Sequence, residues 1–173
     1  DTALDNGLHI LIGAYSETLR LLGKVAPGRE HFLRLPLTLN VQQRFSLRAP
    51  KLPAPLHLAW ALLTAQGLSG ADKRAASRFM QAMKQRAYRL EHDRTVAALL
   101  EENSQPVNLI EYLWSPLCIA ALNTPIARAS AQVFLNVLRD SLGAGRASSD
   151  LLLARMDLTA LFPKPAADYV RAR

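Results

Sequence analysis

The chain has 173 residues, a hydrophobic content of 50%, one cysteine and a formal net charge of +7. This composition favours a folded domain with a substantial core, and it excludes an internal disulfide and a multi-cysteine metal site. The positive charge favours contact with an anionic surface, but aromatic residues make up only 6% and are not interleaved with basic ones, so we expect no nucleic-acid partner. Apolar runs such as 56–65 and 117–122 are too short to span a bilayer, and a lone cysteine suits a reducing compartment. We therefore expect a cytoplasmic protein.

The first predicted elements are a short extended or turn segment and a helix that ends near Gly23. Apolar residues alternate within LDNGLHILIGAY (residues 4–15), and the spacing then becomes helical. From Phe32 to Arg48 the hydrophobic period is two, which predicts one β-hairpin over 32–48. Pro36 lacks a backbone N–H, so the first strand should lie at a sheet edge or carry a bulge.

The chain beyond Pro55 has mainly helical spacing. We predict helices over 56–66, from a Ser69 cap to about residue 90, over 95–102, from 106 to about 118 with Pro116 disturbing its end, and over 127–142. The tail at 150–173 holds a short buried run, a turn around two prolines and a final helix. The fold class is therefore α+β, mainly α: one domain with a hairpin at 32–48, a helical part at 56–145 and a return segment at 150–173.

The residues that most often perform chemistry give no clear site by spacing alone. The four histidines are 22, 26 and 35 positions apart with no H-x-x-x-H pair, which argues against a metal centre. Cys118 lies between Leu117 and Ile119, where a thiol is more often buried and inert than nucleophilic.

Two surface features allow a functional and a purely structural interpretation. The apolar stretches 109–122 and 133–142 could line a tunnel for a long hydrocarbon, although an ordinary helical core explains them more simply. A basic cluster in the helix predicted from Ser69 to about residue 90 could rest on an anionic membrane or could be a solvated face. The cluster consists of Lys73, Arg74, Arg78, Lys84, Arg86 and Arg89.

Beyond these patterns, the chain resembles a known family. A D/E-x-G-x-H-x-x-x-G-x-Y pattern at 5–15 resembles the segment that follows the dinucleotide-binding part of flavin-dependent carotenoid and squalene-type desaturases in the amine oxidase superfamily. The stretches RAPKLPAPLHLAWALL, YLWSPLCIAALNTP, RASAQVFLNVLRDSL and SDLLLARMDLTALFP narrow the likeness to the squalene-associated FAD-dependent desaturases of hopanoid-producing bacteria, understood as hydroxysqualene dehydroxylases. This resemblance runs from about residue 4 to 169.

The resemblance implies the substrate domain of a two-domain FAD-dependent oxidoreductase (a flavoprotein) that acts on a C30 isoprenoid by hydride transfer. Residues 1–15 would be the junction with the FAD domain, which lies outside this chain, so we expect a fragment cut from a longer protein and inactive alone. Asp5, Asn6, Gly7 and His9 would pass near the flavin. The substrate cavity would be shaped by Trp114, Pro116, Leu117, Asn123 and Thr124, with Asn123 the best polar group to hold a hydroxyl. No catalytic acid can be assigned.

Alternatives to this assignment stay open. A carotenoid (phytoene-type) desaturase shares the opening pattern, and a non-enzymatic basic helical module would instead bind an anionic partner. The basic cluster also makes a peripheral position at the inner membrane face an expectation. Apolar surface normally covered by the FAD domain would favour self-association of the fragment.

Overall fold

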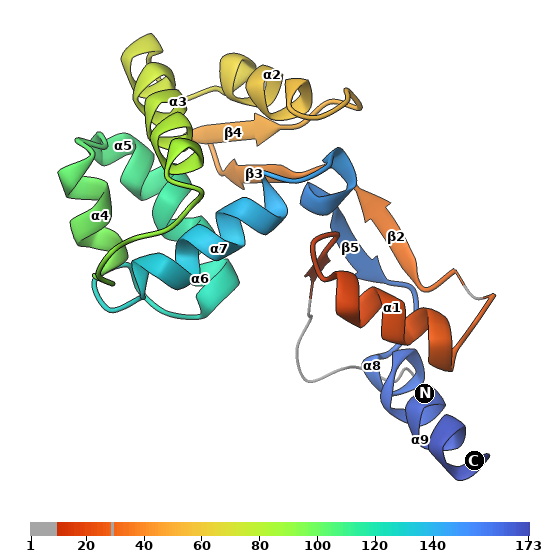
Figure 1. Ribbon diagram of the computed structural model, residues 1–173. Helices are drawn as coiled ribbons and strands as arrows, with labels where there is room; N and C mark the ends of the chain where they lie inside the picture. The colour runs from red at the N-terminus through yellow and green to blue at the C-terminus, as the bar shows by residue number, and fades with distance from the viewer. Residues whose placement is uncertain (1–9, 29) are drawn as a thin grey trace.

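The computed structural model of the protein describes residues 10–28 and 30–173. Its elements form two groups (Figure 1). One group is a bundle of helices with a β-hairpin, and the other is a small sheet covered by three helices. The fold is therefore α+β and mainly helical, as the sequence predicted, but the described residues form two small antiparallel sheets where one hairpin was expected.

The small sheet joins both ends of the described chain. Its strands are β1 (Leu11–Ile12), β5 (Leu151–Ala154) and β2 (Phe32–Leu35), in the order β1-β5-β2, all antiparallel. Leu152 is buried at the centre, opposite Leu11 on one side and Arg34 on the other. Helices α1 (Ser16–Val25), α8 (Leu158–Leu161) and α9 (Pro163–Arg171) accompany this sheet.

The predicted hairpin over 32–48 is wrong in its first part. The hairpin is formed by β3 (Thr38–Val41) and β4 (Phe45–Arg48), with Leu39 opposite Leu47. Strand β2 leaves it at Pro36 and pairs with β5, which lies 116 or more residues later in the sequence. Pro36 separates the two sheets because it cannot continue a hydrogen-bonded ladder. β2 is an edge strand, which agrees with the expectation from Pro36.

The helical group contains α2 (Leu56–Thr64), α3 (Gly70–Gln85), α4 (Val96–Glu102) and α7 (Ala131–Ser141). The cap predicted at Ser69 is present at α3, and Thr95, which was expected as the first residue of a helix, caps α4. Ser69 and Asp72 form a reciprocal capping box, and the Thr95 hydroxyl accepts a hydrogen bond from the Ala98 amide. Such caps satisfy amides that have no partner inside the helix.

Helix α3 ends earlier than predicted. It stops at Gln85, and Ala87 and Tyr88 then adopt left-handed backbone conformations with φ of 50° and 57°. Ala87 is exposed as a result, although the helical period placed it on the apolar face. The sequence shows no glycine or proline at this point to announce the helix end.

The helix predicted over 106–118 is longer and less regular than expected. It comprises α5 (Val107–Leu109), a π-helical segment η1 (Ile110–Trp114) and α6 (Ser115–Leu122). The π-turn directly precedes Pro116, which has no N–H to continue the α-helical ladder. Pro116 therefore disturbs the middle of this helix instead of its end.

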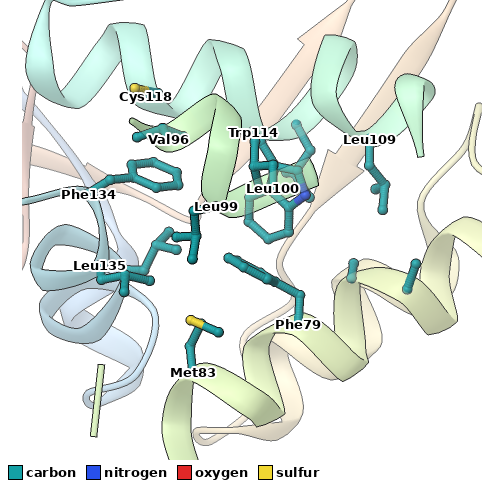
Figure 2. Close-up of a cluster of buried hydrophobic side chains, with 14 of the residues drawn as sticks. Phe79, Met83, Val96, Leu99, Leu100, Leu109, Trp114, Cys118, Phe134 and Leu135 are labelled. Carbon is teal, nitrogen blue, oxygen red and sulfur yellow. The ribbon is translucent and has the colours of Figure 1, made fainter. Parts of the chain in front are cut away.

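The main core lies between α3, α4, η1, α6 and α7. Figure 2 shows its large side chains, among them Phe79, Leu100, Trp114 and Phe134, all 2% exposed or less. The Phe79 and Trp114 rings meet edge to face with centroids 5.1 Å apart. These contacts fix one wall of an apolar pocket.

Candidate functional site

An apolar pocket of about 570 Å³ opens between the β3–β4 hairpin, α2, α3 and the start of α6. This volume lies within the range of roughly 300–1,000 Å³ that is usual for ligand sites. Its lining comes from segments spread over more than a hundred residues of sequence. The residues are Leu37, Leu39, Leu47, Ala54, Pro55, Leu58, Ala59, Ala61, Leu62, Ala76, Ser77, Met80, Gln81, Lys84, Tyr88, Leu113, Trp114, Leu117, Leu142, Gly143 and Ala144.

Local sequence patterns explain why these side chains converge. The period of two in the hairpin sends Leu39 and Leu47 to the same face, where they are cross-strand partners. Helix α2 turns Leu58, Ala61 and Leu62 toward the hollow. The hairpin and α2 thus form one wall, and the main core forms the other.

Polar groups are few in the lining. Successive turns of α3 contribute Ser77, Gln81 and Lys84, and all three side chains are exposed. Tyr88 differs, because it is only 7% exposed and belongs to the core. Burial raises the pKa of its phenol above 10.0, so Tyr88 carries a hydroxyl proton at neutral pH.

Two of the five residues predicted to contact substrate line this pocket. Trp114 is 2% exposed, and its Nε1 donates a 2.9 Å hydrogen bond to Gln105 Oε1. Leu117 lies one helical turn further on and is half-buried. Trp114 thus packs in the core (Figure 2) and is also one of the residues that line the pocket.

Pro116, Asn123 and Thr124 are not among the described residues that line the pocket. Asn123 is exposed and ends α6 in a left-handed conformation with φ of 47°, which asparagine tolerates well. The Thr124 hydroxyl donates to the Leu122 carbonyl over 2.8 Å. These two residues form the C-terminal cap region of a helix, and half-buried Pro116 shapes the π-turn.

The predicted flavin contacts Asp5, Asn6, Gly7 and His9 lie outside the described residues. The later part of the same pattern is described. Gly13 passes so close to Ala147 that a Cβ atom on Gly13 would lie 1.7 Å from the Ala147 carbonyl oxygen. Gly13 therefore has a structural reason to be glycine.

The cysteine and one histidine occupy buried structural positions. Cys118 is fully buried, its thiol donates to the Thr124 carbonyl over 3.4 Å, and burial raises its pKa above 9.0. His57 is 1% exposed, and its Nε2 lies 3.2 Å from the Ser149 hydroxyl. Within residues 10–28 and 30–173 there is no group of three or more potential ligands that could hold a metal ion.

Helix α2 presents an apolar face to solvent beside the pocket. Leu56, Trp60 and Leu63 are 56%, 53% and 65% exposed, and their spacing places them in one stripe. The basic cluster lies on α3 and the loop after it, and its members are largely exposed. None of its six side chains forms an ion pair with a described residue. No described helix has the length and apolarity required to cross a membrane.

The fold and the pocket define a mainly helical domain built around an apolar cavity of ligand size. No family model matches the chain. A relative is found in Zymomonas mobilis subsp. mobilis. Its hydroxysqualene dehydroxylase is 25% identical to this chain over an alignment of 177 residues, and the alignment covers 98% of this chain. The chain spans about 40% of the length of that curated relative. The likeness agrees with the resemblance seen in the sequence motifs, at the level of a distant relationship.

Proposed function

We propose that this chain is the substrate-binding part of an FAD-dependent oxidoreductase that acts on a squalene-type C30 lipid, in squalene and hopanoid biosynthesis. The observation that carries the proposal is an apolar pocket in a chain that is similar, over 98% of its length, to a hydroxysqualene dehydroxylase. The carotenoid desaturase alternative has no comparable support.

The chemistry of the pocket suits a hydrocarbon. Leucine and alanine dominate its lining, and the polar side chains that α3 contributes are exposed. Removing apolar ligand surface from water stabilises a complex by about 25 cal/mol per Å². A long isoprenoid therefore gains most of its binding free energy from contacts of this kind, and the same contacts exclude water from the reacting carbon.

In this proposal, FAD is held mainly by parts of the protein outside the described residues. The sheets that the described residues form are small and antiparallel, whereas dinucleotide sites of the Rossmann type use a parallel βαβ unit with a glycine-rich turn. The assignment of Asp5, Asn6, Gly7 and His9 to the flavin stays a prediction. When bound, reduced flavin would supply the hydride that replaces the allylic hydroxyl, which would leave as water after taking up a proton.

A pair of matched substitutions tests the pocket. Ala59 is exposed and lines the pocket, so Ala59→Trp should block it without disturbing the core. We expect the affinity of the chain for hydroxysqualene in detergent micelles to fall at least tenfold. Ala71→Trp changes another exposed helical alanine, which is not among the described lining residues, and should leave affinity unchanged.

Equal binding by both variants, with folding intact, would reject this pocket as the lipid site. The reaction is tested separately on the intact enzyme that contains this chain, under anaerobic conditions with reduced FAD. Conversion of hydroxysqualene to squalene supports the proposal. Desaturation of phytoene without that conversion would favour the carotenoid branch.

The exposed stripe of α2 supports a second proposal, peripheral contact with an anionic bilayer at the inner membrane face. Leu56, Trp60 and Leu63 would enter the headgroup region, and the basic cluster would lie near anionic lipids, where each cation contributes about 1 kcal/mol. A water-insoluble substrate could then pass from the bilayer into the adjacent pocket.

Vesicle co-sedimentation tests this contact. Leu63→Gln should reduce binding to phosphatidylserine vesicles several-fold, whereas Val170→Gln removes an even more exposed apolar residue, on α9, and should have no effect. High salt should weaken binding by the wild type. If Leu63→Gln instead abolishes self-association measured by light scattering and leaves vesicle binding unchanged, the stripe contacts a second copy of the chain.

A further inference from the structure

We infer that the Tyr88 hydroxyl is the polar contact that holds the hydroxyl group of a ligand in the apolar pocket. This inference rests on the proposed function and adds a residue that the sequence patterns did not single out. It assigns to Tyr88 the role that the resemblance suggested for Asn123.

The environment of the Tyr88 side chain is unusual for a buried phenol. Tyr88 is 7% exposed, belongs to the core and lines the pocket, yet its hydroxyl makes no hydrogen bond to any described residue. Buried tyrosine hydroxyls normally find a partner. Among the described side chains, the nitrogen or oxygen atoms that are both fully buried and unpaired are His31 Nδ1 and His57 Nδ1, so the Tyr88 oxygen keeps accessible surface. A ligand in the pocket can reach it.

The backbone holds Tyr88 in a costly conformation. Ala87 and Tyr88 both have positive φ, which residues with a Cβ atom adopt rarely. The conformation is maintained by two hydrogen bonds: the Tyr88 amide donates to the Met83 carbonyl over 2.8 Å, and Gln132 Nε2 donates to the Tyr88 carbonyl over 2.9 Å. Strain that neighbours maintain in this way is common where a side chain must be aimed at a ligand.

Gly143 leaves the space next to the hydroxyl free. A Cβ atom on Gly143 would come within 3.1 Å of the Tyr88 oxygen, and Gly143 itself lines the pocket. The phenol stays protonated at neutral pH because burial raises its pKa. Tyr88 can therefore donate a hydrogen bond to the oxygen of a ligand alcohol whose hydrocarbon chain contacts the leucines around it.

Binding of two matched lipids tests the inference. Hydroxysqualene and squalene share a C30 chain and differ by one hydroxyl. We expect the wild-type chain to bind hydroxysqualene more tightly than squalene. Tyr88→Phe should lower the affinity for hydroxysqualene roughly three- to tenfold and leave the affinity for squalene unchanged. Tyr112→Phe is the control, because Tyr112 stacks on Phe45 at 6.3 Å and is not among the described lining residues.

Each other outcome has a definite meaning once urea unfolding shows that the variants are folded. Equal loss for both lipids would assign Tyr88 a packing role, and no loss for either would show that its hydroxyl does not contact the ligand. Both results overturn the inference and leave the pocket intact. Failure of the wild-type chain to bind either lipid would reject the proposed function itself.

Discussion

Gly13 and Ala147 are in backbone contact, and this contact excludes any side chain at position 13. A Cβ atom there would lie 1.7 Å from the Ala147 carbonyl oxygen, and the Gly13 amide donates to the Asp150 carbonyl over 2.9 Å. The guanidinium of Arg34 bonds the same two residues, reaching the Ala147 carbonyl at 3.0 Å and the buried Asp150 carboxylate at 3.3 Å. The start and the tail of the described chain are therefore locked together at this point.

Gly13→Ala should destabilise the protein by about 2–4 kcal/mol, because the new methyl group forces the two backbones apart. Gly23→Ala is a matched control within α1, where a Cβ atom would meet nothing within 4 Å. This control should raise stability by about 0.5–1 kcal/mol through helix propensity. Urea unfolding of both variants measures the difference, and equal stabilities would contradict the contact.

His57 should make stability depend on pH. Burial lowers its pKa below 6.5 and nearby Arg146 lowers it further, whereas the Pro53 backbone and, to a smaller extent, Asp150 oppose the shift. The unfolded chain therefore binds the proton more tightly than the folded one, and the free energy of unfolding falls as pH drops through 6.5 toward the folded-state pKa. Above 6.5 this contribution is fully present.

The slope from His57 cannot exceed about 1.4 kcal/mol per pH unit. Urea unfolding between pH 5 and 8 measures it. His57→Gln should flatten the curve in this window, whereas His92→Gln changes an exposed ring and should keep the wild-type slope. An unchanged slope in His57→Gln would show that another group controls the pH dependence.

The capping box at α3 should contribute measurably to stability. The Ser69 hydroxyl accepts from the Asp72 amide over 3.2 Å, and Asp72 Oδ2 accepts from the Ser69 amide over 2.9 Å. Ser69→Ala should cost about 0.5–2 kcal/mol. Ser77→Ala, at an exposed position inside the same helix, should be neutral or slightly stabilising in thermal unfolding. If the two variants unfold alike, the cap contributes nothing.

Local patterns in the sequence predicted the features that depend on near neighbours. The cap at Ser69 follows from residue type and spacing, and so do the β3–β4 hairpin and the helical part. The pairing of β2 with β5 could not be read locally, because it joins residues more than a hundred positions apart and only Pro36 indicated a break. The β5 segment was expected only as a short buried run.

The candidate site shows the same limit. Trp114 and Leu117 were selected through the family resemblance and line the pocket, whereas Asn123 and Thr124 cap a helix. Tyr88 was missed because the helical period continues through Ala87 in the sequence. That period gives no sign of the left-handed turn that sets the position of the Tyr88 side chain. The turn after α3 is held by long-range hydrogen bonds in which Gln132 accepts from the Leu90 amide and donates to the Tyr88 carbonyl, and no local pattern reveals these bonds.

Fluorescence of Trp114 tests the central claim that the pocket binds a C30 isoprenoid. The chain has two tryptophans, so Trp60→Phe leaves Trp114, at the pocket wall, as the sole emitter. Titration with hydroxysqualene should change its emission saturably with one lipid per chain, and adding Ala59→Phe to Trp60→Phe should abolish the change. A folded Trp60→Phe protein whose Trp114 emission does not respond to the lipid would contradict the claim.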